Sequence, residues 1–269
     1  MNPGIFYTDT GTGLPVIFIH GYCETHRVWD YAIPQLSRSF RVVAIDLPGF
    51  GKSPLPESGF SLADIASMTH DLLARLGITG PVMIGHSLGG YMTLAYTGKY
   101  RGELKGLGLF HSTAYADTPD KKQNRTRLID FIGINGTESF LRTFIPSLFY
   151  DGKISEYRNI INKLTAEASG TPAKTIQEYA RAMRDREEHT DILSTFPGPV
   201  MMIIGRNDNS VPFEKSREQA QLIKDPHVLT LDETAHMGMY EKPEETLSHL
   251  QRFLEVCQKK APDTGALNL

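Results

Sequence analysis

Apolar residues follow one another in short runs along the chain, and Gly, Pro or Asp residues interrupt them. Such continuous apolar runs are typical of parallel strands that are buried on both faces of a sheet. Between the runs lie stretches with apolar residues near helical spacing, as in residues 61–76. Alternating strands and helices predict an α/β fold with a mostly parallel sheet and helices on both faces. The predicted strands span residues 15–20, 41–45, 82–84, 106–110, 200–205 and 227–231.

The start of the chain predicts a different arrangement. Residues 5–8 and 15–19 flank the turn-forming segment 9–13, which has the sequence DTGTG. A short connection that contains glycine is typical of two antiparallel strands. We therefore expect these two segments to pair with each other at one edge of the sheet.

The alternation of strand and helix stops after Phe110 and resumes at Val200. The intervening stretch has no convincing strand, and its four predicted helices span residues 120–132, 138–144, 155–168 and 173–186. We therefore predict a core domain of residues 1–111 and 193–269, into which a helical cap of residues 112–192 is inserted.

The 269 residues (30.0 kDa) suffice for a large domain with an insertion, so size alone requires no disulfide or metal. There are 28 Lys and Arg residues against 31 Asp and Glu, which gives a formal charge of -3. This balance argues against binding to nucleic acid or to an anionic membrane through net charge. Cys23 and Cys257 are far apart and indicate neither a disulfide framework nor a zinc site.

Residues 1–13 lack the basic and apolar regions of a secretory signal. The apolar runs are also far shorter than the roughly 20 residues that a membrane helix needs. A chain with two cysteines suits a reducing compartment. We therefore expect a cytoplasmic protein that does not bind to membranes.

A Gly-x-Ser-x-Gly segment, Gly85–Gly89, follows the predicted strand 82–84 and precedes an apolar helical run at 90–100. A serine at such a strand-to-helix turn needs small neighbours, because the turn is strained and tightly packed. The turn presents the serine hydroxyl above the end of the sheet. We therefore expect Ser87 to be a nucleophile rather than part of an ordinary glycine-rich turn.

A serine hydroxyl is a weak nucleophile near neutral pH, so it needs a base. Catalytic groups of open parallel sheets gather at the C-terminal ends of the strands. His236 lies just past strand 227–231 and is the predicted base, while His111 also follows a strand and remains an alternative. His86 adjoins Ser87, but adjacent residues on such a turn point apart, so we expect His86 to pack beneath the turn.

A carboxylate must orient the base. Asp208 follows strand 200–205 at the same edge of the sheet and is the predicted acid. Asp232 is its competitor because it also follows a strand, but it lies only four residues before His236. The order Ser87, Asp208, His236 along the chain is the order typical of a serine at such a turn.

Acyl transfer also needs hydrogen-bond donors aimed at the developing oxyanion. The backbone N–H of Leu88, directly after the nucleophile, is one expected donor. The backbone N–H of Tyr22 is the other, because Gly21 allows the chain to turn after strand 15–20.

At this point the chain resembles the α/β-hydrolase superfamily in five segments that occur in order. Ser87 differs from the Asp nucleophile of epoxide hydrolases and haloalkane dehalogenases, so the resemblance disfavours these two activities. The single helical cap resembles the branch of carboxylesterases, enol-lactonases and carbon–carbon bond hydrolases. The resemblance implies that Trp29 braces the oxyanion loop from the core, and that Asp46 and Gly49 hold a tight loop. The five segments are His20-Gly21-Tyr22 with Trp29, residues 46–53, residues 85–90, residues 205–212 and His236.

The residues and the resemblance together predict a serine hydrolase that cleaves carboxylic esters or lactones of small apolar or aromatic acids through an acyl-enzyme. This chemistry requires no metal and no organic cofactor. A carbon–carbon bond hydrolase or a cofactor-free perhydrolase with the same site is an alternative. A ligand receptor or signalling partner with slow turnover is an alternative of another class.

Phe131, Phe140 and Phe144 of the cap, together with Met237, are candidates for the substrate pocket. The helical spacing of the phenylalanines fits packing of the cap on the core equally well. The cap segment 121–127 (KKQNRTR) carries four positive charges and no negative one. A solvated helix face is the ordinary interpretation of this segment, and docking of an acidic carrier protein is the alternative.

Overall fold

The computed structural model describes residues 4–259, so the ends of the predicted core, residues 1–3 and 260–269, lie outside the described residues. The described part contains a seven-stranded sheet with the strand order β1-β3-β2-β4-β5-β6-β7. Every neighbouring pair in this sheet is parallel except β1 with β3. The prediction of a mostly parallel sheet is therefore confirmed. The strands are β1 (Tyr7–Thr10), β2 (Pro15–Ile19), β3 (Arg41–Ile45), β4 (Val82–His86), β5 (Gly106–Phe110), β6 (Val200–Gly205) and β7 (Pro226–Leu231).

The edge strand β1 is antiparallel as predicted, but the predicted pairing of β1 with β2 is wrong. β2 lies between β3 and β4 and pairs with both, so it has no free edge for β1. The connection from β1 to β2 instead passes close to the residues that precede β3. Gly11 has a φ of 83° there, and a Cβ on it would collide with the backbone oxygens of Ser37 and Phe40.

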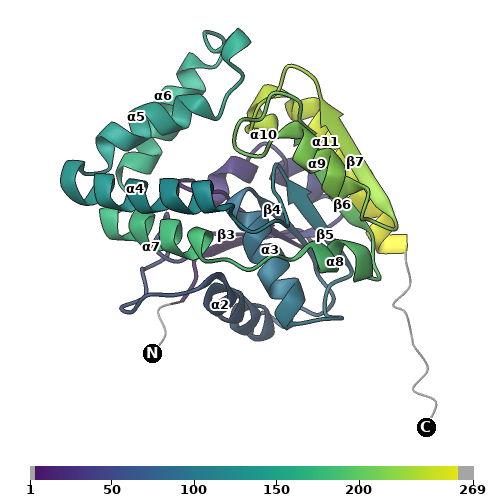
Figure 1. The fold of residues 1–269 in the computed structure, drawn as a ribbon. Coiled ribbons are helices and arrows are strands. Elements are labelled where there is room, and N and C mark those ends of the chain that lie inside the picture. The colour runs from purple at the N-terminus through teal and green to yellow at the C-terminus, as the bar shows by residue number, and fades with distance from the viewer. Residues whose placement is uncertain (1–3, 260–269) are drawn as a thin grey trace.

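Helices lie on both faces of the sheet, as predicted (Figure 1). α2 packs beside α3 on the sheet, and α11 packs against α10 and β7. α2 begins with a capping box, in which Ser61 and Asp64 each accept the other's backbone N–H. The helices of the core are η1 (His26–Trp29), α1 (Ile33–Leu36), α2 (Leu62–Arg75), α3 (Leu88–Lys99), α9 (Phe213–Ala220), α10 (Gly238–Glu241) and α11 (Pro243–Lys259).

The segment between β5 and β6 is helical throughout its regular structure and forms the inserted cap. α4 packs along α7, and α5 packs along α6, to one side of the sheet (Figure 1). The four predicted helices are present with shifted ends, whereas the short α8 was not predicted. α8 has only six residues, too few to show a repeated apolar pattern, and it packs against α3 and α9. The helices are α4 (Pro119–Asn135), α5 (Glu138–Ser147), η2 (Asp151–Lys153), α6 (Arg158–Ser169), α7 (Ala173–Arg184) and α8 (Thr190–Thr195).

The core lies on both sides of the central strands, and every residue of β4, β5 and β6 is buried. This burial explains why these strands are apolar at successive positions. Trp29 is also fully buried, with its ring 4.6 Å from that of Phe18 and 5.5 Å from that of Phe110. Trp29 is therefore a core residue.

Within residues 4–259, no helix combines the length and the apolar character needed to cross a membrane.

Candidate active site

Ser87 occupies the sharp turn between β4 and α3. Its backbone has φ 49° and ψ -112°, a conformation that costs a non-glycine residue about 1–3 kcal/mol. The turn is crowded, because a Cβ on Gly85 would collide with the backbone of Gly89, and one on Gly89 with the carbonyl oxygen of Ile19. The expected glycines thus permit the turn, and Ser87 directly precedes α3.

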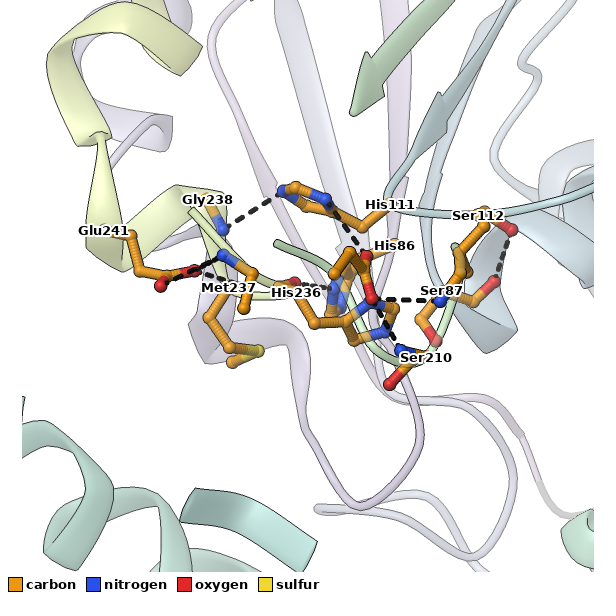
Figure 2. A network of polar contacts seen from close by, with 12 residues as sticks. His86, Ser87, His111, Ser112, Ser210, His236, Met237, Gly238 and Glu241 are labelled. Carbon is orange, nitrogen blue, oxygen red and sulfur yellow. Dashed lines mark hydrogen bonds and ion pairs between the residues drawn. The ribbon is translucent and has the colours of Figure 1, made fainter. Parts of the chain in front are cut away.

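Asp208 follows β6 and His236 follows β7, and the structure brings their side chains together. His236 Nδ1 lies 2.7 Å from Asp208 Oδ2, with both side chains buried. Asp208 Oδ1 also accepts the backbone N–H groups of Ser210 and Val211, at 2.8 and 2.9 Å. Because Asp208 engages Nδ1, Nε2 is the nitrogen of His236 that can serve Ser87. His86, the residue before Ser87, bonds to the His236 carbonyl, and Figure 2 draws these side chains together.

The competing acid, Asp232, is placed elsewhere. Its side chain is 75% exposed and pairs with Arg206 at the protein surface. It therefore shares no hydrogen bond with His236, although it follows the same strand. The C-terminal strand ends gather several polar residues, and the direction of each loop decides which of them meet.

His111, the alternative base, packs against the acid. Its Nδ1 lies 3.5 Å from Asp208 Oδ2, and its Nε2 accepts the backbone N–H of Gly238 at 3.2 Å. Since Nε2 accepts, the proton of the neutral ring is on Nδ1 and faces Asp208. Burial lowers the pKa of His111 to about 4, which keeps the ring neutral near pH 7.

Two imidazoles thus face one carboxylate. Burial alone would raise the pKa of Asp208, but His236 and His111 outweigh it and hold that pKa well below its usual range. The ligand atoms of the three side chains lie within 4.8 Å of one another, a spacing that a metal ion would also fit. The proton on His111 Nδ1 occupies the ligating position of that nitrogen, so the bond of His236 to Asp208 and the 3.5 Å contact of His111 account for the cluster.

The two expected oxyanion donors lie on either side of the serine turn. Leu88 is the first residue of α3, and the first N–H groups of a helix have no partner within that helix. Tyr22 is buried directly after β2, and its hydroxyl donates to the carbonyl oxygen of Ile176 in α7 at 2.6 Å. The Tyr22 side chain is therefore anchored on the cap, while its backbone belongs to the loop beside α3.

Comparisons with known proteins agree with this architecture. Residues 15–129 match the family model of the alpha/beta hydrolase fold. A thermophilic esterase from Thermogutta terrifontis, solved with malate bound, is 28% identical and superposes with a TM-score of 0.89. The match covers 94% of this chain and 94% of that chain. The chain therefore has the α/β-hydrolase fold.

Relatives of this α/β hydrolase include further hydrolases that match along nearly all of the chain. The 2-hydroxy-6-oxo-6-(2'-aminophenyl)hexa-2,4-dienoic acid hydrolase of Metapseudomonas resinovorans is 27% identical, over 95% of this chain and 90% of that protein. The pimeloyl-[acyl-carrier protein] methyl ester esterase of Methylococcus capsulatus is 26% identical, over 93% of this chain and 98% of that protein. These relatives are hydrolases and esterases, and each matches more than 90% of this chain.

Sequence reasoning missed two carboxylates of this α/β hydrolase. Glu24 is buried and pairs with His86, which packs beneath the serine turn as expected. Glu241 accepts the backbone N–H groups of Ala235 and Met237, on either side of His236. Both glutamates lie close in sequence to the loops that they hold, but their burial was not visible in any apolar pattern.

The candidate pocket residues fall into two groups. The rings of Phe140 and Phe144 stack at 4.8 Å, and their centroids lie 6.2 and 5.7 Å from that of Tyr22. Met237 is fully buried next to His236. Phe131, in contrast, is 41% exposed on α4. The structure thus brings two of the three phenylalanines to the Tyr22 side chain and leaves the third at the surface.

A cavity of about 760 Å³ opens beside α3, away from the serine. Tyr91, Leu94, Arg186 and His189 are among its lining residues, whereas Ser87 and His236 are not. The chemistry, rather than the size of this cavity, therefore locates the candidate active site.

Proposed function

We propose that this α/β hydrolase is a serine hydrolase that cleaves carboxylic esters or lactones of small apolar or aromatic acids. The observation that carries the proposal is the 2.7 Å bond between His236 and Asp208, beside a serine in a strained strand-to-helix turn. The same three residue types in this arrangement perform nucleophilic acyl transfer on several unrelated folds.

In the first half of the proposed reaction, Ser87 Oγ attacks the carbonyl carbon of the substrate, and its proton passes to His236 Nε2. Asp208 stabilises the imidazolium that forms and keeps its Nδ1–H directed away from the substrate. The carbonyl oxygen becomes an oxyanion, which accepts from the backbone N–H groups of Tyr22 and Leu88. Collapse of this intermediate breaks the bond to the alcohol, and His236 returns the proton to the leaving oxygen.

In the second half, a water molecule attacks the acyl carbon and gives its proton to His236. The bond from the acyl carbon to Ser87 Oγ then breaks, and the serine recovers the proton from His236. The carboxylic acid leaves and the enzyme returns to its starting state. In a lactone the alcohol and the acid are parts of one molecule, so ring opening gives a single hydroxy acid.

The acyl group is proposed to lie against Phe140 and Phe144. Both rings contact Tyr22, whose backbone N–H is one of the two proposed oxyanion donors. Apolar rings beside the reacting carbonyl favour a small apolar or aromatic acid, because such an acid gains from leaving water there.

Cleavage of a carbon–carbon bond is the second candidate function. It is favoured by the similarity to the 2-hydroxy-6-oxo-6-(2'-aminophenyl)hexa-2,4-dienoic acid hydrolase, which extends along 95% of this chain. This reaction, and perhydrolysis, would use the same serine site. A receptor with slow turnover would react once with its ligand and then keep the product bound in the site.

The proposed partner is a small molecule rather than a carrier-linked acid. Two basic side chains of the segment 121–127 are engaged within the protein, because Lys121 Nζ donates to the Ser210 carbonyl and Arg125 pairs with Asp117. The low cysteine count supports a reducing, cytoplasmic location.

A panel of esters and lactones of increasing acyl length, together with a β-diketone-type substrate, tests the proposal. We expect many turnovers per enzyme on short apolar or aromatic esters and lactones. Preferred turnover of the β-diketone-type substrate would replace the ester proposal with carbon–carbon cleavage. A single burst with lasting covalent occupancy across the panel would support the receptor instead.

A further inference from the structure

Beneath the serine turn, Glu24 and His86 form an ion pair that the proposed acyl transfer does not use. Glu24 Oε2 lies 2.9 Å from His86 Nδ1, and the two side chains are 2% and 0% exposed. A buried ion pair contributes little net stability in comparison with apolar residues of similar volume. Its contacts with the neighbouring loops therefore matter more than its own energy.

The contacts of His86 fit a ring that carries a proton on each nitrogen. Nε2 lies 2.9 Å from the carbonyl oxygen of His236, which can only accept. Nδ1 faces Glu24 Oε2, and this oxygen also accepts the backbone N–H of Gly21 at 2.6 Å. An ionised Glu24 can accept from both donors through this oxygen, and both nitrogens of His86 then donate as an imidazolium.

The charges of the pair support this assignment. Burial alone would lower the pKa of His86, but Glu24 and the His236 carbonyl outweigh it and raise that pKa above its usual value. Burial alone would likewise raise the pKa of Glu24, but His86 and the Gly21 amide lower it. Each partner therefore stabilises the charged form of the other.

The pair connects three loops that meet at the candidate active site. Glu24 holds Gly21, whose neighbour Tyr22 carries a proposed oxyanion donor. His86 directly precedes Ser87 in the serine turn. His86 also holds the backbone carbonyl of His236, and the two imidazole rings lie 5.0 Å apart. One continuous chain of hydrogen bonds thus runs from the oxyanion loop through the serine turn to the loop of the base.

We propose that Glu24 and His86 are positioning residues, which fix the positions of the Tyr22 amide and the His236 loop relative to Ser87. This inference rests on the proposed function. The pair does not touch the substrate, so it acts through the geometry of the residues that do. A misplacement of about 1 Å at a reacting group lowers the rate by about 100-fold, which sets the size of the expected effect.

Substitutions of Glu24 test the role in catalysis. We expect Glu24→Ala to lower kcat on a short ester by about 100-fold and to leave KM nearly unchanged. Glu24→Gln should recover part of this loss, because its amide oxygen can still accept from Gly21. A folded Glu24→Ala enzyme with the kcat of the wild type would overturn the proposal, and so would equal losses in the two variants.

Asp46→Asn is the matched control. Asp46 is a buried carboxylate that lies 2.7 Å from His26 Nδ1, but it bonds to neither Gly21 nor His236. We expect this variant to lose stability and to keep kcat within about twofold, since it removes a similar pair without releasing either loop. A comparable loss of kcat in Asp46→Asn would assign the Glu24 effect to general destabilisation and overturn the proposal.

A measurement on the wild-type protein tests whether the Glu24–His86 pair is charged, even if the variants do not fold. The ¹⁵N shifts of the His86 ring should show both nitrogens protonated at pH 7, where an ordinary histidine is largely neutral. A neutral His86 at pH 7 would overturn the proposal. The ¹⁵N measurement does not depend on turnover. Failure of the proposed function would appear separately, as unchanged turnover in Ser87→Ala.

Discussion

His111 Nδ1 lies 3.5 Å from Asp208 Oδ2, the same oxygen that accepts from His236. The carboxylate of the proposed triad therefore faces two imidazoles that follow different strands. His111 receives the Gly238 N–H on its other nitrogen and so presents a donor to Asp208. This arrangement gives the second histidine a role in setting the charge of the acid.

Replacing His111 by Leu should move the acidic limb of the pH profile of kcat/KM to higher pH. Without the facing imidazole, the pKa of Asp208 rises, so the carboxylate that orients His236 is protonated at higher pH than in the wild type. His111→Asn, whose amide nitrogen can replace Nδ1 as a donor, should retain the wild-type profile. An unchanged acidic limb in His111→Leu would show that the contact with Asp208 has no effect on titration.

Substitution of the proposed triad should abolish most turnover. We expect Ser87→Ala or His236→Ala to lower the turnover of a short p-nitrophenyl ester by roughly four to six orders of magnitude, and Asp208→Asn somewhat less. Asp232→Asn is the control, because Asp232 follows the same strand as His236 but pairs with Arg206 at the surface. Wild-type rates in Ser87→Ala would refute the assignment of the nucleophile.

The two stacked phenylalanines should set the acyl preference. Phe144→Ala removes a ring beside Tyr22, so we expect about tenfold lower kcat/KM on short acyl esters and a preference for longer ones. Phe131→Ala should change neither, because Phe131 is 41% exposed on α4. Measurement of kcat/KM across acyl length tests both variants. The same dependence on acyl length in Phe144→Ala as in the wild type would show that Phe144 does not line the pocket.

The Glu24–His86 pair should make stability depend on pH in a defined window. The raised pKa of His86 adds stability that is complete below the usual 6.5 and is lost as pH rises through the raised value. The lowered pKa of Glu24 adds stability that is complete above the usual 4.5 and is lost as pH falls through the lowered value. The pair therefore contributes fully between these two pH values.

We accordingly expect the stability deficit of Glu24→Gln to be largest near pH 5.5 and to shrink toward both acidic and alkaline pH. Urea unfolding of wild type and variant across this range measures the difference in unfolding free energy. The titratable groups coupled to the pair are His20, Cys23, His111, Asp208 and Tyr240, and the His236 ring lies 5.0 Å from that of His86. A deficit that did not vary with pH would argue against a charged pair.

The basic segment of the cap should not affect the turnover of small esters. Lys122 and Arg127 are exposed, whereas Lys121 and Arg125 bond to Ser210 and Asp117, so the double variant Lys122→Glu/Arg127→Glu tests docking with little disturbance of the fold. We expect unchanged turnover of both a small ester and an ester linked to an acidic carrier protein. A selective, salt-dependent loss on the carrier-linked ester would instead support docking.

Much of this fold could be predicted because its information is local. Continuous apolar runs marked β4, β5 and β6, since each of their residues is buried on one face or the other. Ser87 was recognisable because a strained turn between strand and helix demands glycines at fixed positions. Asp208 and His236 followed from their places after the strands, at the end where parallel strands bring polar groups together.

The tertiary structure decided which of these residues meet. β1 pairs with β3 because both sides of β2 are taken, which depends on strands far apart in the chain. Burial of Glu24 and the direction of the His111 ring likewise depend on loops that contact each other only after folding. The sequence by itself therefore determined the type of fold and the proposed nucleophile, base and acid. Only the tertiary structure placed the polar groups that hold them, because hydrogen bonds between distant loops leave no periodic pattern in the chain.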